Sequence, residues 1–149
     1  MTPAPPRVRD IHIAPGRRLA TKSVTEVVAE AGTGLVGDRY HGTKHRHVSV
    51  QSWPTLQLAA AQLGSPVAPG STRRNLTLTH GDVPTTPGSH LYVGSVLLEV
   101  VRVAAPCRPL DDAIGPGAAE ALRRRAGSIC RVLESGTINV GDEVTIEER

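Results

Sequence analysis

Apolar and polar residues alternate with a period of two along most of the chain, and Gly or Pro interrupts the pattern every few residues. Such alternation is typical of short strands with one buried face. It predicts strands at 7–13, 24–29, 47–52 and 73–80, two strands within 90–103, and three short strands within 128–148. Turns are predicted at Val93-Gly94-Ser95, Ser135-Gly136 and Gly141-Asp142.

Two segments instead have helical signals. The first begins at Ser52 as N-cap, accepts Pro54 in its first turn and ends at Gly64, and the second covers residues 118–127 and ends at Gly127. Short strands without regular strand–helix alternation predict a β-rich fold, mixed α+β by content, in which a barrel-like sheet carries a few short helices. We expect residues 1–6 to form a disordered tail and residues 7–149 to form a single domain.

Gly32, Gly34 and Gly37 spell G-x-G-x-x-G after the strand predicted at 24–29. A dinucleotide site would need a helix opening at the third glycine and an acidic residue about 20 positions further on. Neither is present, which leaves a turn that carries Asp38, Arg39 and His41. Two interpretations remain open for this turn. In one, Asp38 bonds nearby backbone amides, and in the other the loop delivers Arg39 to an anion.

The composition restricts the kinds of molecule that the protein is expected to bind. The net charge of +3 and the pI near 9.3 favour an anionic partner, but one Trp and two Tyr make a poor stacking platform, so we do not expect nucleic-acid binding. The N-terminal residues lack the apolar core of a signal peptide and no stretch is long and apolar enough for a membrane span. We therefore expect a cytoplasmic protein with free thiols and no membrane partner.

Four polar clusters are candidates for chemistry, at 21–23, 37–42, 72–75 and 105–109. Three of them place Lys or Arg beside small hydroxyl or amide groups, which suits a shared anion site, although each alone also fits a solvated loop. Cys107 lies beside Arg108, and nearby cations favour the reactive thiolate, whereas Cys130 lies in an apolar strand and is expected to be inert. His41, His45 and His47 alternate with Lys44 and Arg46, which disfavours a metal site in that loop.

Four segments, GLVGDRYHG, RRNLTLT, LYVGSVLLEVVRVAAPCRPL and AGSICRVLESGTINVGDEV, resemble in that order the motifs of the MOSC domain, named for the C-terminus of molybdenum cofactor sulfurases. The resemblance covers nearly the whole chain after residue 6, and the length is similar to that of the small stand-alone bacterial members. It implies a β-barrel-like fold and a site for the molybdenum cofactor, with no pyridoxal phosphate on this chain.

The resemblance also implies roles for individual residues. Cys107 matches the cysteine that ligates molybdenum, and Arg74 with Asn75 matches an arginine–asparagine pair that holds the cofactor. Lys22 and Ser23 match a lysine–serine pair on the first loop, and Arg39 matches the arginine of the glycine-bounded turn. The neighbouring residues Arg73, Asp38 and His41 complete the predicted cofactor-binding set. Ala105 stands where amidoxime-reducing members carry a serine.

Three functions are compatible with this resemblance. The first is reduction of small N-hydroxylated compounds at molybdenum ligated by Cys107, with electrons from a separate redox partner. The second is a sulfur carrier, in which Cys107 takes persulfide sulfur from a donor such as a cysteine desulfurase. The third is a non-catalytic molybdenum cofactor carrier. All three depend on the same thiolate, so the sequence leaves them open.

Overall fold

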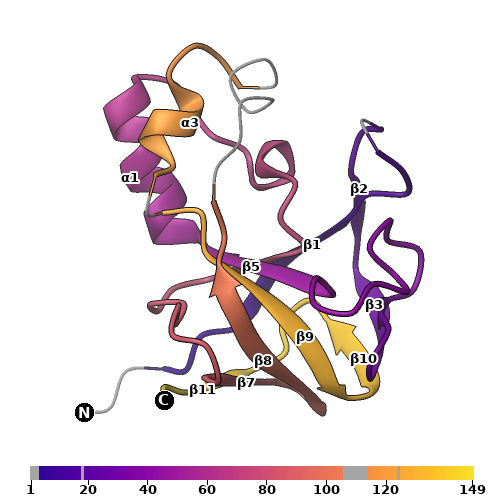
Figure 1. Cartoon of the computed structure of the whole chain (residues 1–149). Helices are drawn as coiled ribbons and strands as arrows, with labels where there is room; N and C mark the ends of the chain where they lie inside the picture. Colours follow the sequence, from indigo (N-terminus) through magenta and orange to yellow (C-terminus); the bar gives the residue numbers. More distant parts are fainter. Residues whose placement is uncertain (1–3, 18, 106–113, 124) are drawn as a thin grey trace.

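A computed structural model describes residues 4–17, 19–105, 114–123 and 125–149 of the chain. The strands are β1 (Val8–Ile13), β2 (Lys22–Val24), β3 (Glu26–Glu30), β4 (Gly34–Leu35), β5 (Val48–Ser52), β6 (Leu76–Leu78), β7 (His90–Val93), β8 (Val96–Val103), β9 (Ser128–Glu134), β10 (Gly136–Asn139) and β11 (Val144–Glu147). The helices are α1 (Trp53–Leu63), the 3₁₀ helix η1 (Pro69–Thr72) and α3 (Ala118–Ala121). The strand-rich content confirms the predicted fold class (Figure 1).

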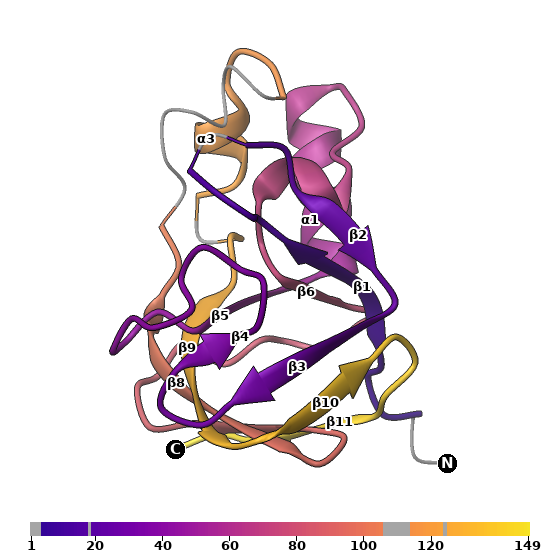
Figure 2. The ribbon, with the colours of Figure 1, turned by 90° about the vertical axis from the view of Figure 1, so that its right-hand side faces the viewer.

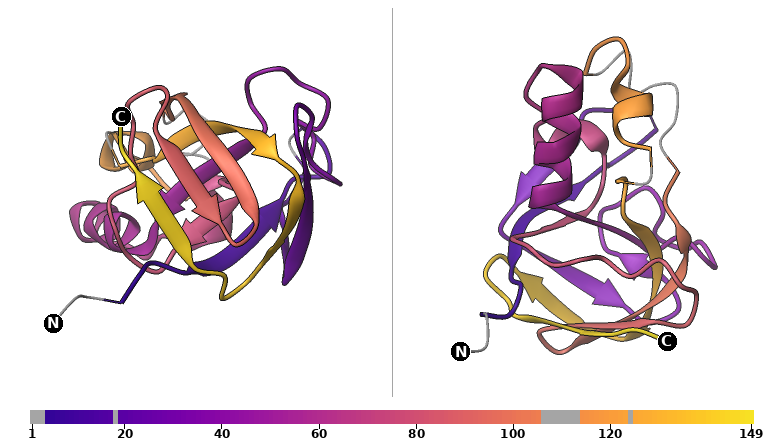
Figure 3. Two further views of the ribbon diagram at one scale, coloured as in Figure 1. Left: turned by 90° about the horizontal axis from the view of Figure 1, so that it is seen from below. Right: turned by 90° about the vertical axis from the view of Figure 1, so that its left-hand side faces the viewer.

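An eight-stranded sheet in the order β11-β7-β8-β9-β5-β6-β1-β2 forms the body of the domain. The sheet stays open, but it curls until the start of β1 meets the turn before β11. Three backbone hydrogen bonds join the two ends, from Val8 N to Asp142 O (2.9 Å), from Gly141 N to Val8 O (2.8 Å) and from Val144 N to Pro6 O (2.8 Å). Seen from below, the strands surround a central axis (Figure 3, left). The result is barrel-like, as the sequence predicts.

A second sheet, in the order β10-β3-β4, closes one side of the barrel (Figure 2). Thr25 marks the point where the chain passes from the first sheet to the second, because β2 pairs with β1 and β3 pairs with β10. The single strand predicted at 24–29 is therefore wrong in its extent. Two strands that belong to different sheets meet there.

Aliphatic side chains from both sheets fill the barrel. Val48, Val50, Leu76, Leu98 and Ile138 are among the fully buried members of this core. The chain contains no Phe, so β-branched residues and Leu provide the packing. Alternation places them inward and sends intervening residues outward, which is the pattern that predicted the strands.

The helices lie at the upper end of the barrel in Figure 1, where α1 packs on α3 through a small apolar cluster that includes Leu56, Ala59 and Leu122. Helix α1 has the predicted bounds and Gly64 ends it in a left-handed conformation, although the Ser52 hydroxyl makes no capping bond. Helix α3 is shorter than the predicted 118–127. After Ala121 the chain tightens into a turn, and Ala126 is drawn into a separate cluster against β8 and β9.

Of the predicted N-terminal tail, residues 1–3 lie outside the described part of the chain. Residues 4–6 lie against the C-terminal strands and β6. There the carbonyl of Ala4 accepts a bond from His80 Nε2 at 2.8 Å, and that of Pro6 accepts from Val144 N. The prediction of one domain over 7–149 stays a prediction.

Candidate functional site

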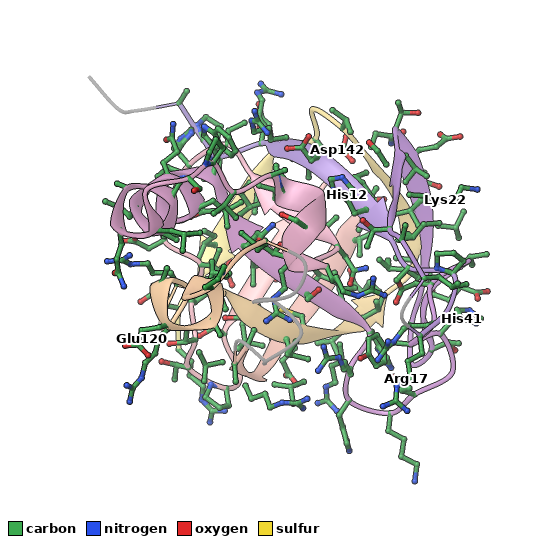
Figure 4. All side chains as sticks on the ribbon, turned by 90° about the horizontal axis from the view of Figure 1, so that it is seen from above. His12, Arg17, Lys22, His41, Glu120 and Asp142 are labelled. Atoms are coloured by element: carbon green, nitrogen blue, oxygen red, sulfur yellow. The ribbon has the colours of Figure 1, made fainter. Side chains whose placement is uncertain are left out.

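Most predicted site residues with described placement lie on or beside three connecting segments, and Arg74 links one of these segments to the chain just after β8. These segments are the β1–β2 loop at 14–21, the β4–β5 loop at 36–47 and η1 with its exit at Arg73. Figure 4, viewed from above, shows Arg17, Lys22 and His41 along one margin, with His12 nearer the centre on β1. Loops that a rigid sheet positions in this way are where binding residues concentrate.

Asn75 lies at the centre of this arrangement and is 5% exposed. Its Oδ1 accepts from the backbone N of Ser49 (2.9 Å) and from the Ser49 hydroxyl (3.1 Å). Its Nδ2 donates to the carbonyl of His12 (3.0 Å) and to Oδ1 of Asp38 (3.2 Å). The amide therefore ties β5, β1 and the β4–β5 loop together, which is a positioning role.

Asp38 has the role that the first interpretation of the glycine-bounded turn predicts. Its Oδ1 accepts from Ala14 N at 2.9 Å and its Oδ2 accepts from Tyr40 N at 3.2 Å. The backbone of Arg39 in turn donates to Ala14 O at 2.7 Å. No helix follows Gly37, so the structure lacks the feature that a dinucleotide site would need at this turn. Asp38 thus fastens the turn to the β1–β2 loop.

Arg73 and Arg74 point to different parts of the site. Arg73 adopts a left-handed conformation (φ 63°) and its guanidinium donates to Leu19 O at 2.5 Å and Gly16 O at 3.4 Å, so it braces the β1–β2 loop. Arg74 is 7% exposed and its Nη2 donates to Ala105 O at 3.1 Å. The Arg74 side chain therefore reaches the chain two residues before Cys107.

A buried polar network that the sequence analysis missed supports η1. Gln51 is fully buried; its Nε2 donates to the Thr77 hydroxyl (2.9 Å) and to Pro69 O (3.3 Å), and its Oε1 accepts from the Thr72 hydroxyl (2.9 Å). Because both ends of the Gln51 amide have hydrogen-bond partners, the network holds η1 in a fixed position relative to the sheet. This in turn sets where Arg73 and Arg74 leave the helix.

Lys22 and Ser23 are both exposed on β2, but they lie on opposite faces of the strand. Ser23 pairs with His12 and Lys22 pairs with Ile13 in the antiparallel register. Successive residues of a strand point to opposite faces. The structure therefore brings Ser23 to the face of His12 and leaves Lys22 at the margin seen in Figure 4.

The guanidinium of Arg39 lies over the ring of Tyr40 at 4.4 Å, and that of Arg46 lies over the same ring at 4.3 Å. Arg39 also donates to the Tyr40 hydroxyl. His41 is not part of the contacts of this stack, and its Nε2 lies 2.5 Å from Glu30 Oε1. Arg39 is thus half-buried and braced by Tyr40, and His41 is engaged by Glu30 of β3.

Most of this site lies in a part of the chain that matches a known protein family. The family model of the MOSC domain matches residues 37–145, which include the glycine-bounded turn, the Arg74–Asn75 pair and Cys107. The chain belongs to the MOSC domain family. MOSC domains are associated with molybdenum cofactor binding.

Solved structures share the fold of this MOSC domain. The YuaD protein from Bacillus subtilis superposes with a TM-score of 0.83 at 20% identity over 96% of both chains. YiiM from Geobacillus stearothermophilus has a TM-score of 0.76 at 21% identity over 97% of this chain and 76% of YiiM. For YiiM from Escherichia coli the values are 0.74 and 19% over 99% of this chain and 71% of YiiM. A comparison with curated proteins found no match.

Of the two cysteines of the MOSC domain, Cys130 lies within the described part of the chain. Cys107 lies outside the described residues, so its predicted role stays a prediction. Cys130 is a free, buried thiol on β9, and burial raises its pKa to about 12. It stays protonated at neutral pH, in keeping with the expected inert packing.

His12 is a candidate that the sequence analysis did not identify. Its ring lies against η1, since a Cβ placed on Gly70 would come within 3.0 Å of Nε2. Its Nδ1 is buried without a hydrogen-bond partner, and burial lowers the pKa of the imidazole against the raising effect of Asp10. A neutral imidazole with an unsatisfied nitrogen beside the Arg73–Arg74 turn fits a site that takes a hydrogen-bonding ligand.

His47 is buried and links the β4–β5 loop to β9. Val132 N donates to its Nδ1 at 2.9 Å, so Nε2 carries the proton and donates to Thr43 O at 2.6 Å. Both nitrogens are occupied by the protein. In the described part of the chain, no group of three His, Cys, Asp or Glu side chains has the arrangement of a metal site.

Among the residues with described placement, no helix has both the length and the apolar character that crossing a bilayer requires.

Proposed function

We propose that this MOSC domain binds the molybdenum cofactor at the upper end of its barrel and reduces small N-hydroxylated compounds with electrons from a separate donor. The observation that carries the proposal is the bond from Arg74 Nη2 to Ala105 O at 3.1 Å. It brings Arg74, the arginine of the family's arginine–asparagine pair, against the chain two residues before Cys107.

The residues at this end fit an anionic group that accepts hydrogen bonds. Lys22, Ser23 and Arg39 are the donors that reach the surface around the site, and His12 contributes a buried nitrogen without a protein partner. Guanidinium and ammonium groups suit the phosphate of a pterin cofactor. Cys107 would supply the soft thiolate that a thiophilic metal prefers.

In this proposal Asp38, Asn75 and Arg73 position the loops and do not contact the ligand. Their polar atoms already bind the backbone of neighbouring segments, so they set the positions of the loops and leave ligand contacts to other side chains. Preorganised loops lower the entropic cost of holding a ligand.

The overall reaction breaks the N–O bond of the substrate. A compound R–NH–OH takes up two electrons and two protons and gives R–NH₂ and water, while the external donor is oxidised by two electrons. The molybdenum cofactor supplies the two-electron oxygen-transfer chemistry when it is bound. The chain supplies the anchoring thiolate of Cys107, the cations around the cofactor and an imidazole, His12, that is neutral near pH 7.

Anaerobic turnover of benzamidoxime with reduced methyl viologen tests the proposal on protein made in a host that synthesises molybdenum cofactor. We expect the wild type and Cys130→Ala to form benzamidine, and Cys107→Ala to be inactive. If cofactor-loaded wild type forms no benzamidine, the reductase proposal fails. Intact protein that instead carries one extra sulfur on Cys107 indicates the sulfur carrier, and bound cofactor without turnover indicates the carrier of cofactor.

A further inference from the structure

Two arginines of the β4–β5 loop share one aromatic ring. The guanidinium carbons of Arg39 and Arg46 lie 4.4 Å and 4.3 Å from the centre of the Tyr40 ring. The two carbons are therefore separated by no more than these two distances together. All three residues are half-buried. His41, which is labelled in Figure 4, marks this loop at one margin of the candidate site.

The two guanidinium groups repel each other, and no carboxylate in the described part of the chain forms an ion pair with either of them. Asp38 is the acidic residue of the loop, and its carboxylate already accepts from two backbone N–H groups. Against that one carboxylate the loop carries Arg39, Lys44 and Arg46. The loop therefore holds more positive charge than its own acidic group balances.

Two carboxylates on adjoining strands are engaged by other side chains. Glu30 of β3 lies 2.5 Å from His41 Nε2, and Glu99 of β8 lies 2.5 Å from Arg131 Nη2. The ion pair of Glu99 with Arg131 has no net charge. Counting Glu30 together with Asp38 still leaves one of the three cations of the loop unbalanced.

The Arg46 side chain has hydrogen-bond donors that the protein does not use. Its Nε is buried without a partner, and its guanidinium makes no hydrogen bond within the part of the chain that the structure describes. A cation–π contact attracts the charge but leaves the N–H donors without an acceptor. Because Nε is enclosed, a ligand would meet the terminal Nη groups. Buried polar groups are normally hydrogen-bonded, so an arginine in this state indicates an acceptor from outside the chain.

The loop is held in shape before any ligand binds. Thr43 bridges its two ends, because its hydroxyl lies 2.8 Å from Tyr40 O and 3.0 Å from Arg46 O. The carbonyl of Thr43 accepts from Nε2 of the buried His47 at 2.6 Å, which fastens the loop to the sheet. Tyr40 and Arg46 are therefore presented in one geometry, and preorganisation of this kind lowers the cost of binding.

The number of donors and their placement select the ligand. A carboxylate has two oxygens in one plane, which suit the fork of a single arginine. A tetrahedral phosphate has acceptor oxygens on several sides and can meet two guanidinium groups at once. Arginine also combines contact with an aromatic ring and binding of phosphate more readily than lysine does.

We propose that Arg46 and Arg39 bind a phosphate group and that Tyr40 holds both guanidinium groups in position for it. The family motifs assign a role to Arg39 but none to Arg46. The site requires neither Cys107 nor molybdenum. Two sources can supply the phosphate: the pterin tail of the cofactor, which rests on the proposed function, and a free or substrate phosphate.

Binding of inorganic phosphate tests the site without relying on catalysis. The ³¹P linewidth is titrated at constant ionic strength on protein from a host that cannot make molybdenum cofactor. We expect Arg46→Gln and Arg39→Gln each to weaken binding about tenfold, because each removes one charged fork. The matched control is Lys44→Gln, which removes an exposed cation of the same loop and should stay within about twofold of wild type. Arg46→Lys keeps the charge but not the fork, so it should lose about threefold, and it replaces Arg46→Gln if that variant does not fold.

Four results would overturn the phosphate site. They are no binding of phosphate by the wild type, wild-type affinity in the folded Arg46 variants, a loss in Lys44→Gln as large as theirs, and displacement of phosphate by an equal concentration of acetate. The last result would show that any small anion satisfies the arginines.

Cofactor-loaded protein distinguishes the two sources of phosphate. If loading blocks the binding of added phosphate, the cofactor supplies the group that Arg46 holds, and if the affinity is unchanged, the loop takes a second phosphate. Turnover of benzamidoxime with reduced methyl viologen is measured separately. A loaded wild type that is inactive in that assay refutes the reductase, while the phosphate result on cofactor-free protein stands.

Discussion

The side-chain amide of Asn75 and the carboxylate of Asp38 are joined by a hydrogen bond of 3.2 Å from Nδ2 to Oδ1, and both residues are 5% exposed. This bond connects the segment after η1 to the glycine-bounded turn, 37 residues earlier in the chain. Two motifs of the family thus meet through their own side chains. The bond fixes the glycine-bounded turn relative to the segment after η1, and in this way it sets the shape of the site.

We expect Asn75→Ala to lower the free energy of unfolding by about 2–4 kcal/mol, because it removes the side-chain bonds to Ser49 N and His12 O and one of the bonds to the Asp38 carboxylate. Urea denaturation measures the loss. The control is Lys22→Ala, an exposed change that should stay within about 0.5 kcal/mol of wild type. Equal stabilities for Asn75→Ala and wild type would show that the amide does not position the loops.

Much of this arrangement could be predicted from local patterns. Alternation located β1, β5, β7 and β8, and bonding of Asp38 to backbone amides was one of the two interpretations of its turn, because Asp often does so in turns. His12, Gln51 and Ser49 escaped prediction because their partners are distant in sequence, and only the β1–β6 and β5–β6 pairings bring them together. The opposite facing of Lys22 and Ser23 was not predicted, because the strand was expected to begin only at residue 24 and the family motif treats the two residues as a pair.

Gly127 shows a requirement for glycine that comes from a close approach. Its φ is +86°, and a Cβ at this position would lie 1.8 Å from Val50 O. We expect Gly127→Ala to cost more than about 4 kcal/mol or to prevent folding, because a backbone carbonyl cannot move aside. Gly141→Ala is the matched control, since Gly141 also has a positive φ (+95°) but no atom within 4 Å of an added Cβ. Thermal unfolding of the two proteins should differ sharply, and similar midpoints would contradict the geometry.

The stability of the domain should depend on pH through its buried histidines. Burial lowers the pKa of His47 and His12 below the ordinary value of 6.5, and for His47 nearby His45, Arg131 and His41 lower it further against the raising bond to Thr43. Below about pH 6.5 the unfolded chain therefore binds more protons than the folded one, so stability falls as the pH falls toward the folded-state pKa values.

Urea midpoints between pH 5 and pH 7.5 measure this dependence. His47→Asn removes one titrating group, and its amide oxygen can still accept from Val132 N in place of Nδ1. We expect a shallower decline on acidification for this variant than for the wild type. An unchanged slope would assign the pH dependence to other groups.

Thiol reactivity should separate the two cysteines. Cys130 is buried with a pKa of about 12, so a disulfide reagent at pH 8 should leave it unmodified in native Cys107→Ala and should label it after denaturation. Cys130→Ala should retain one reactive thiol, which is Cys107. Rapid labelling of native Cys107→Ala would show that Cys130 is accessible and would remove the reason for excluding it from sulfur chemistry.

The most direct test of a cofactor site at Cys107 is the molybdenum and pterin content of purified protein from a host that makes molybdenum cofactor. The wild type, Cys107→Ala and Cys130→Ala are compared by elemental analysis and by fluorescence of the oxidised pterin. We predict near-stoichiometric molybdenum and pterin in the wild type and Cys130→Ala, and loss of molybdenum from Cys107→Ala. Wild-type protein without molybdenum, or Cys107→Ala with the same content as the wild type, would contradict that assignment.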